Sequence, residues 1–534
     1  MLLSLRMIAR LLGILRVLAR HDAAEAFESM GLRGTPLWLM QKLGRGRGEG
    51  RPGVRLAAAL TELGPSYIKL GQSLSTRADI LGDELAADLS ALQDQIPPFS
   101  FAEAKAAIEA ELGAPLATLF AELEEESVSA ASIAQVHLGL VAEPQADAEL
   151  SEEGEEAENG ESDPPAPELR AVAVKILRPG IERAFERDLR LFFWLARLAE
   201  RTQPRLRRLK PVAVVQLFAD QVALEMDLRY EAAGMSEIAE NFEGDDSYRV
   251  PEVDWHRTAR RVLTMSRVGG IPMDDREALL AADLDLTEVL RTAAGIFFKQ
   301  VFRDGLFHGD QHPGNMMIDD EGRVVAVDFG ILGRLDQDTR LVLADMMIAT
   351  LQRDYRRLAE IQVQAGYLPN DRSLDTFAQA LRSVCEPIID RPLQEISFAQ
   401  LLAQLFQLTE SFAMPVQPQL LLLQKNMMMA EGISRRLAPE LNIWTLAQPL
   451  IEEWIIRNRS PAARLQEGAR SLQRILQRGP QVLSDLEAIA KEVREGGLRL
   501  VVPEIERSDG AATRRVAYVA IVLSALAILS ALID

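Results

Sequence analysis

The chain has 534 residues, 48% of them hydrophobic, which is enough for two or three domains with a sizeable core. The formal net charge of −20 is local, because residues 143–168 hold eleven acidic residues and no basic one; the rest is mildly acidic and gives no indication of a nucleic-acid-binding face. One cysteine, Cys385, excludes an internal disulfide framework, and five histidines without metal-ligand spacing argue against a zinc site.

Residues 1–20 (MLLSLRMIARLLGILRVLAR) predict a basic amphipathic helix. Its four arginines fall within about a third of a helical wheel, and apolar residues fill most of the rest. Such a helix suits an anionic membrane surface, and the alternative is that it packs on the protein's own core. The arginines interrupt any signal-peptide core. A flexible Gly/Arg linker follows at 44–53 and completes an N-terminal segment over 1–50.

Residues 55–115 are expected to form a helical extension. Lys69 and Gln72 are three residues apart and share a helix face. Gly71 lies between them and indicates close backbone approach by a neighbouring segment. Taken alone, the stretch is better explained by a solvated lysine and a tolerated glycine.

From residue 116 the hydrophobic period changes to that of short strands, and residues 116–270 are expected to form a small, strand-rich lobe. Small side chains let backbone N–H groups approach phosphates, so a turn of small residues is a candidate phosphate-covering loop. That turn consists of Ser129, Ala130, Ala131 and Ser132, and an ordinary β-turn is an equally good explanation. Residues 143–168 are expected to be a disordered acidic insert between two strands.

A strand lysine and an acidic helix follow. Lys175 lies near the end of a strand at 170–177, like the protein-kinase strand lysine that pairs with the α- and β-phosphates. Helices are expected at 181–200 and 211–242. The second helix offers three candidate partners for Lys175, namely Glu225, Asp227 and Glu231. Glu225 and Glu231 are six residues apart and do not share a face, so one is expected to meet Lys175 and the other a different group, with Lys69 a candidate.

The stretch 307–330 (FHGDQHPGNMMIDDEGRVVAVDFG) has the clearest chemical signal. Its two apolar runs around a tight turn predict a β-hairpin that brings Asp328 beside Asn315. Asp310 precedes Asn315 at the spacing of the protein-kinase catalytic loop, and Asp328 begins an intact DFG sequence. An Asp and an Asn offer the oxygen ligands that suit Mg²⁺. A surface hairpin with solvated acids does not account for this order and spacing.

Residues 271–496 are otherwise expected to be helical, with one helix at 286–306 leading into this stretch. Residues 420–429 are apolar nearly all round and predict a buried helix. After a linker at 497–515, residues 516–533 contain no charge and follow two arginines. These 18 residues would span about 27 Å as a helix, just enough for a bilayer core. They predict a single-pass C-terminal anchor with the preceding chain on the cytoplasmic side.

Five motifs, in this order, resemble those of the UbiB/ADCK family of atypical kinases. They are KLGQ at 69–72, the Ala/Ser turn leading into Ile133–His137, Glu225-Met-Asp227, HGDQHPGN at 308–315, and DFG at 328–330. The likeness covers about residues 55–440. It implies an α+β, bilobal protein-kinase-like fold with an added N-terminal helical KxGQ extension and a C-terminal transmembrane tail. Many bacterial members end in a hydrophobic hairpin, whereas this chain shows one clear segment.

The resemblance also implies ATP and Mg²⁺ as cofactors. In this hypothesis Asn315 and Asp328 hold Mg²⁺, Lys175 is oriented by Glu231, and Asp310 accepts or orients the proton of the attacking water or hydroxyl. Residues expected around the nucleotide are Ser129, Ala130, Ala131, Ser132, Lys175 and Met265. Those expected in a regulatory cap over the cleft are Lys69, Gln72, Glu225 and Asp227.

The function implied is support of ubiquinone biosynthesis by an ATP-dependent phosphotransferase or ATPase at the bacterial inner membrane. Expected partners are anionic lipids such as cardiolipin, quinone-precursor lipids and other ubiquinone-biosynthesis proteins, with no nucleic acid. The alternative is a catalytically weak pseudokinase scaffold that binds nucleotide and quinone-precursor lipids. A flavin-dependent hydroxylase would need G-x-G-x-x-G after a strand, and the glycine-rich residues 44–50 have no apolar strand before them.

Overall fold

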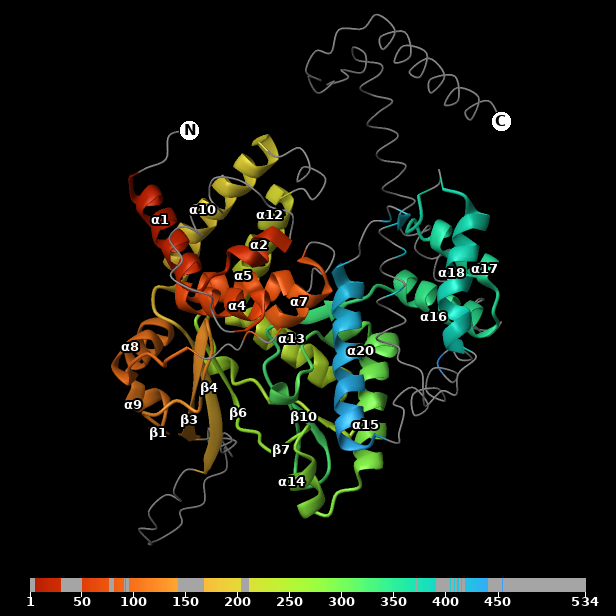
Figure 1. The fold of residues 1–534 in the computed structure, drawn as a ribbon. Helices are drawn as coiled ribbons and strands as arrows, with labels where there is room; N and C mark the ends of the chain where they lie inside the picture. Colours follow the sequence, from red (N-terminus) through yellow and green to blue (C-terminus); the bar gives the residue numbers. More distant parts are fainter. Residues whose placement is uncertain are drawn as a thin grey trace, which may run out of the picture. The chain divides into compact units, whose positions relative to one another are not determined.

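The computed structural model describes residues 5–29, 50–75, 81–90, 96–142, 168–202, 211–369, 372–389 and 418–439, with single residues at 92, 404, 408, 411, 412, 414 and 454. All belong to one compact unit, Met1–Ile456 (Figure 1). The acidic insert apart from Glu168, the linker at 497–515 and the predicted membrane span at 516–533 lie outside the described residues. None of the described helices is both long and apolar enough to cross a bilayer.

A five-stranded antiparallel sheet forms the small lobe. Its order is β1-β3-β4-β6, with β2 also paired to β3. The strands are β1 (Glu122–Leu123), β2 (Ser129–Ala130), β3 (Ala134–Ala142), β4 (Leu169–Leu177) and β6 (Val262–Ser266). Helix α8 (Phe101–Leu112) covers the face that buries Val172, Val174 and Ile176. Because successive strand residues alternate in direction, Lys175 points to the opposite face.

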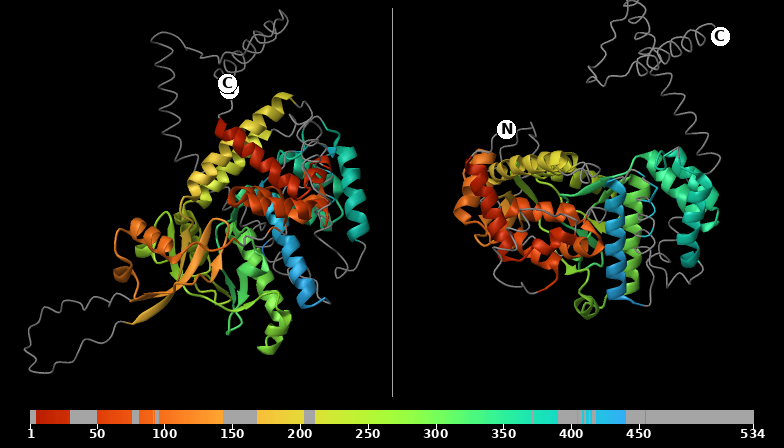
Figure 2. Two further views of the ribbon diagram at one scale, coloured as in Figure 1. Left: turned by 60° about the vertical axis from the view of Figure 1, so that its left-hand side comes forward. Right: turned by 45° about the horizontal axis from the view of Figure 1, so that its top comes forward.

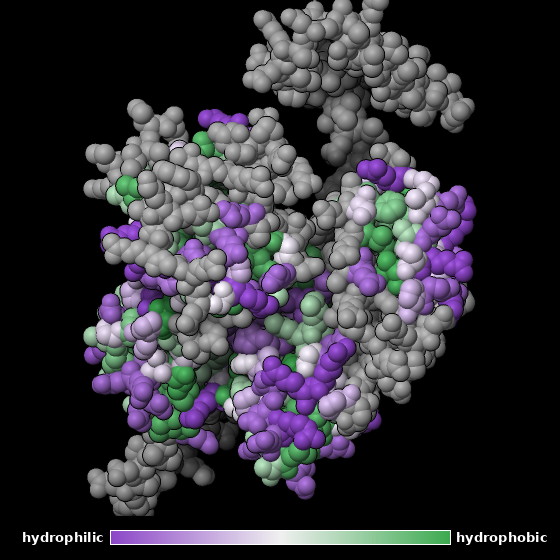
Figure 3. Space-filling model, in the orientation of Figure 1, coloured by the Kyte–Doolittle hydropathy of each residue, from purple (hydrophilic) through white to green (hydrophobic). Residues whose placement is uncertain are grey.

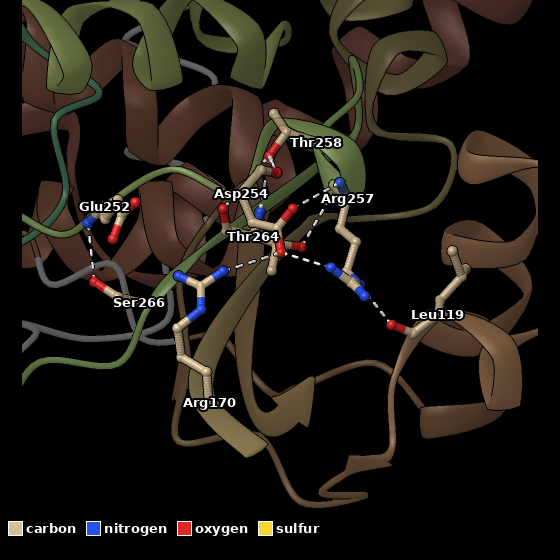
Figure 4. A network of polar contacts seen from close by, with 8 residues as sticks. All are labelled: Leu119, Arg170, Glu252, Asp254, Arg257, Thr258, Thr264 and Ser266. Atoms are coloured by element: carbon tan, nitrogen blue, oxygen red, sulfur yellow. Dashed lines mark hydrogen bonds and ion pairs between the residues drawn. The ribbon is translucent and has the colours of Figure 1, made fainter. Parts of the chain in front are cut away.

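A buried carboxylate is the centre of a network of polar contacts at the outer edge of this sheet (Figure 4). Asp254 is 6% exposed and pairs with Arg170 of β4 at 3.3 Å and with Arg257 at 2.8 Å. Arg257, in the 3-10 turn η1 (Trp255–Arg257), also donates to the carbonyl of Leu119 at the end of α9 (Leu116–Leu119). Two guanidinium groups thus offset the cost of burying one carboxylate.

The N-terminal helices pack beside this lobe. They are α1 (Leu5–Arg20), α2 (Ala24–Ser29), α4 (Pro52–Leu63), α5 (Pro65–Ser75) and α7 (Asp83–Ser90), and they share one core with α10 (Ile181–Thr202) and α12 (Pro211–Glu225) (Figures 1 and 2). A Cβ on Gly71 would lie 2.5 Å from Leu92 Cδ1 and 2.7 Å from Leu60 Cδ1. The close approach predicted at Gly71 is therefore present, but the neighbours are side chains rather than backbone.

Helix α1 packs on the protein's own core. Ile14 and Leu18 are buried in it, and Arg10 donates to Asp188 of α10 at 3.2 Å. Arg10 also lies over the ring of Tyr67 in α5, at 5.5 Å from its centroid. Of the two expectations for residues 1–20, the structure shows the core-packed helix, whose buried side chains are not available to a membrane.

The large lobe contains a second sheet, in the order β5-β10-β9-β7, and a two-stranded sheet of β8 and β11. The predicted hairpin is present, with Val324 opposite Ile318 and Ala326 opposite Met316. The strands are β5 (Tyr248–Arg249), β7 (Ile271–Pro272), β8 (Leu306–His308), β9 (Met316–Ile318), β10 (Val324–Ala326) and β11 (Leu332–Arg334). The helices are α13 (Leu228–Asn241), α14 (Arg276–Ala281), α15 (Leu286–Phe298), α16 (Gln337–Leu351), α17 (Tyr355–Gln364), α18 (Leu374–Ile389) and α20 (Pro418–Leu437), with the π-helix η2 (Lys299–Asp304) and the 3-10 turn η3 (Pro313–Asn315).

Two predicted helices differ from those observed. The helix expected at 211–242 is broken into α12 and α13, because Asp227 adopts φ −131° and its carboxylate accepts a hydrogen bond from the N–H of Arg229. The helix expected to be buried at 420–429 has a mixed surface. Met428 is 49% exposed, whereas the polar Asn426 is fully buried. Helix α20 lies alongside α15 (Figures 1 and 2).

Helices α16, α17 and α18 have a core of their own. It is built around Phe377, Leu381, Leu358 and Ala359. In the orientation of Figure 1, hydrophilic residues line the outer edge of these helices, and hydrophobic ones gather between them (Figure 3). This is the pattern of amphipathic helices that bury one face.

Candidate active site

One lysine joins the two lobes at the centre of the site. Lys175 Nζ donates to Glu231 Oε1 at 2.7 Å, to Glu231 Oε2 at 3.0 Å and to Asp328 Oδ1 at 2.9 Å. Lys175 comes from the central strand β4, Glu231 from the first turn of α13, and Asp328 from the loop after β10. Of the three acids that the sequence left open, Glu231 is thus the partner of Lys175.

The three charges shift one another's proton affinities. The charge of Lys175 holds the pKa of Asp328 far below its usual range, and the nearby charge of Lys69 adds to this effect. Burial raises the pKa of Glu231, and Lys175 only partly offsets that rise. Burial works to lower the pKa of Lys175, but the charges of Asp328 and Glu231 outweigh burial and raise it. Lys175 and Asp328 are therefore both charged at neutral pH.

The DFG segment holds Asp328 in an uncommon backbone conformation. Asp328 has φ +60°, in the left-handed region that few non-glycine residues adopt. The next residue, Phe329, is buried, and its ring lies 5.1 Å from that of His308 in an edge-to-face contact. Gly330 donates its N–H to Asp328 Oδ1 at 3.3 Å. The buried phenyl ring and this turn fix the carboxylate toward Lys175, and such strain is common at functional sites.

The catalytic-loop segment is tied to the DFG segment through His308. His308 Nδ1 accepts a hydrogen bond from the N–H of Asp310 at 3.1 Å, and Nε2 lies 3.3 Å from the carbonyl oxygen of Val327. These bonds require a neutral ring protonated on Nε2. Burial lowers the pKa of His308, in agreement with that state. Val327 also donates its N–H to the carbonyl of Asn315, so Asp328 follows directly beside Asn315.

Asn315 and Asp328 are the two residues of the site that could hold a magnesium ion. The amide nitrogen of Asn315 donates to the carbonyl of Asp310 at 3.1 Å, which orients the side-chain oxygen Oδ1 as an acceptor. Asp328 is ionised, its side chain is 51% exposed, and both of its hydrogen bonds within the described residues are made by Oδ1. Among the described residues no group of three His, Cys, Asp or Glu side chains could enclose a metal. Two protein ligands suit Mg²⁺, which is commonly shared with substrate phosphates.

Helix α20 supplies two site residues that the sequence reasoning missed. Lys425 Nζ lies 2.7 Å from Asp310 Oδ1, and Asn426 donates from Nδ2 to the carbonyl of His308 at 2.6 Å. The sequence predicts only an apolar helix here, and both residues lie more than a hundred positions after the loop that they contact. The only local signal was a Lys-Asn pair inside a run of leucines and methionines.

The helical extension approaches the site through a second ion pair. Lys69 Nζ lies 2.9 Å from Glu225 Oε2, and both side chains are largely buried. This is the pairing suggested for Lys69. Gln72 lies one turn further along α5 and is partly buried. Asp227 is not a partner of Lys175, because its carboxylate caps α13 and pairs with Arg229 at 2.7 Å.

The small-residue turn lies later in the chain than predicted. Ser129 and Ala130 form strand β2, and the chain reverses at residues 131–134, where the N–H of Ala131 donates to the carbonyl of Ala134 at 2.8 Å. Ser132 is fully buried, and its hydroxyl has no hydrogen-bond partner among the described residues. Met265 packs into the core cluster that contains Leu263 and Phe329.

Comparison with known proteins places these features in a family. The ABC1 atypical kinase-like domain matches residues 91–146 and 166–362, and the UbiB helical domain matches residues 381–442. A "Probable protein kinase UbiB" of Marinobacter nauticus is 38% identical over 449 residues, covering 83% of this chain and 78% of that protein. Proteins of the same description are 41% identical over 436 residues in Xanthomonas axonopodis pv. citri (80% of this chain, 75% of that one) and 38% over 501 residues in Pseudomonas aeruginosa (92% and 89%).

Proposed function

The chain belongs to the UbiB family of ABC1 atypical kinase-like proteins, and from this we propose that it is a membrane-associated, ATP-dependent phosphotransferase or ATPase that supports ubiquinone biosynthesis. The observation that carries the proposal is the contact of Lys175 with both Glu231 and Asp328. Phosphoryl transfer depends mainly on positioning and on charge neutralisation. A strand lysine held between a helix acid and the DFG aspartate supplies both.

Lys175 is the residue that binds the α- and β-phosphates in this proposal. Its ammonium group is positioned by Glu231, and the two Glu231 oxygens at 2.7 and 3.0 Å leave it little freedom to rotate away. Asn315 and Asp328 hold Mg²⁺. When bound, Mg²⁺ neutralises charge on the phosphate oxygens. The chain reversal after Ser129 and Ala130 lies at the end of the same sheet and is proposed to cover the phosphates.

Asp310 is proposed to take the proton of the attacking group. As the oxygen of water or of a lipid-borne hydroxyl forms a bond to the γ-phosphorus, its proton passes to the Asp310 carboxylate, and the bond from phosphorus to the ADP oxygen breaks. With water as acceptor the products are ADP, inorganic phosphate and a proton. The hydrogen bond that the Asp310 N–H donates to His308 Nδ1 fixes the backbone that carries the carboxylate.

The proposed association with the membrane is supported by sequence rather than by the geometry of the site. This support consists of the family membership and of the uncharged residues 516–533, which lie outside the described part of the chain. We propose that this segment anchors the protein in the inner membrane with the catalytic region on the cytoplasmic side. Anionic lipids and quinone-precursor lipids are the proposed partners. Cofractionation of the full chain with membranes, and its loss when residues 516–533 are deleted, tests the anchor.

The enzymatic proposal is tested by ATP hydrolysis with the full-length protein on cardiolipin-containing vesicles. Lys175→Met is expected to lower kcat by about 100-fold or more, because it removes a cation from the phosphate site. Lys299→Met is the matched control, since it removes a lysine from an ion pair with Asp245 outside the site. Equal turnover in Lys175→Met and wild type would contradict the proposal.

A nucleotide-binding scaffold is the second candidate. It is favoured by the Lys69–Glu225 pair, which holds the helical extension near the site. The charge of Lys69 is close enough to help lower the pKa of Asp328. A scaffold would bind MgATP, with Lys175 required for binding, and would show no hydrolysis with or without vesicles. Measuring MgATP binding and turnover on the same preparation separates the two functions.

A further inference from the structure

A lysine from helix α20 meets the catalytic-loop aspartate. Lys425 Nζ lies 2.7 Å from Asp310 Oδ1. The side chain of Lys425 is 30% exposed and that of Asp310 is 23% exposed. The pair is thus neither sequestered in the core nor fully solvated. A substrate that approaches the Asp310 carboxylate also approaches the Lys425 ammonium group.

The neighbouring residue fixes the position of Lys425. Asn426 is fully buried, its Nδ2 donates to the carbonyl of His308 at 2.6 Å, and its Oδ1 accepts from the N–H of Gln311 at 3.3 Å. Asn426 therefore bonds the loop on both sides of Asp310. These two bonds fix the position of α20 relative to the loop. Lys425 therefore contacts Asp310 from a fixed backbone position and not as a freely rotating surface side chain.

The catalytic loop has no permanent cation of its own. Its sequence, HGDQHPGN, contains no lysine or arginine. His308 is neutral, as its hydrogen bonds require. His312 Nδ1 accepts a hydrogen bond from the N–H of Gly314 at 3.0 Å and caps the turn η3. A fixed positive charge beside Asp310 therefore has to come from another element, and Lys425 supplies it.

We propose that Lys425 is a catalytic cation of the phosphoryl-transfer site, which orients Asp310 and then binds an oxygen of the transferred phosphoryl group. This inference rests on the proposed function. As the proton of the attacking hydroxyl passes to Asp310, that carboxylate becomes neutral and attracts Lys425 less. The oxygen–phosphorus bond forms while the bond to ADP breaks, and the ammonium group neutralises a phosphoryl oxygen where negative charge is concentrated.

The test compares variants of Lys425 in the full-length protein on cardiolipin-containing vesicles. Lys425→Met keeps the aliphatic stem and removes the charge, and it is expected to lower kcat by about 10- to 100-fold. KM for ATP is expected to stay within about threefold of wild type, because Lys175 and the metal ligands are untouched. Lys425→Arg is expected to recover most of kcat, since it restores a cation at the same place.

Two controls separate this role from a structural one. Arg436→Met removes a cation from the same helix, where Arg436 pairs with Asp274, and is expected to leave kcat unchanged. In an Asp310→Asn background, Lys425→Met is expected to cause much less loss than it does alone, because the two residues act as a unit. If Lys425→Met folds poorly in thermal unfolding, Lys425→Gln takes its place in the same comparisons.

Each result decides one of the two claims. A wild-type kcat in Lys425→Met, together with loss of activity in Lys175→Met, overturns the role of Lys425 and leaves the proposed function standing. Higher turnover in Lys425→Met also overturns it, because Lys425 would then restrain Asp310. Absence of turnover in wild type and Lys175→Met alike refutes the proposed enzyme, and the inference with it.

Discussion

Replacing Glu231 by glutamine tests which acid serves Lys175. The substitution keeps the shape of the side chain and removes the charge that lies 2.7 and 3.0 Å from Nζ. Removing one partner of a buried ion pair commonly costs 3–5 kcal/mol, because it leaves an unpaired charge. Here Lys175 keeps Asp328 at 2.9 Å. The expected loss in the free energy of unfolding is therefore smaller, about 1–2 kcal/mol.

The effect on function is expected to be larger than the effect on stability. Without the Glu231 charge, Lys175 is drawn toward Asp328 alone and is no longer held where the phosphates bind. We expect kcat/KM for ATP to fall by about 10- to 100-fold, which corresponds to about 1.4–2.8 kcal/mol of transition-state stabilisation. Urea unfolding and ATP hydrolysis on the same preparation measure both quantities.

Glu225→Gln is the matched control, because Glu225 pairs with Lys69 rather than with Lys175. It is expected to leave kcat/KM for ATP within about threefold of wild type or to raise it, since it removes the charge that pairs with Lys69 of the helical extension and leaves Lys175 with both of its partners. If Glu225→Gln lost activity while Glu231→Gln retained it, the assignment of the two acids would be refuted.

Two further predictions concern stability. Burial lowers the pKa of His308 in the fold, so the unfolded chain binds a proton at this histidine more readily than the folded chain does. The contribution of His308 to the free energy of unfolding is therefore complete above the unfolded pKa of about 6.5 and is lost as the pH falls below that value. Urea unfolding between pH 5 and 8 measures this loss, and His308→Gln should flatten it; an equally steep fall in the variant would assign the effect elsewhere. Gly71→Ala is expected to destabilise the fold by about 1–3 kcal/mol, because its Cβ would lie 2.5 Å from Leu92 Cδ1. Gly13→Ala, which meets no atom within 4 Å, is the control and should be neutral or stabilising in thermal unfolding; equal midpoints for the two variants would contradict the close packing at Gly71.

The parts of the site that follow from short-range pattern were predictable. The apolar runs around the turn at 319–322 specify the hairpin, and the hairpin alone brings Asp328 to Asn315. The six-residue separation of Glu225 and Glu231 indicated that they serve different lysines. Lys69 pairs with Glu225, and Lys175 pairs with Glu231. The two acids lie on different helices, because the chain breaks at Asp227, whereas the sequence predicts a single helix.

The parts that depend on packing between distant segments were not predictable. An amphipathic helix has the same pattern whether its apolar face meets lipid or protein, so residues 1–20 did not reveal that Ile14 and Leu18 are buried in the helical core. The apolar content of residues 420–429 predicts a buried helix, whereas the role of α20 at the site comes from Lys425 and Asn426. The local sequence does not indicate which distant loop a buried asparagine will hydrogen-bond.

Asp310 and Asp328 are the residues proposed to carry out phosphoryl transfer. Release of phosphate from ATP by the full-length protein, measured on cardiolipin-containing vesicles for wild type, Asp310→Asn, Asp328→Asn and Asp320→Asn, tests this claim most directly. Asp320 lies exposed at the tip of the same hairpin and serves as the control. Asp310→Asn and Asp328→Asn are expected to lose about 100-fold or more in turnover, whereas Asp320→Asn is expected to retain it. Unchanged turnover in Asp310→Asn and Asp328→Asn would contradict the claim.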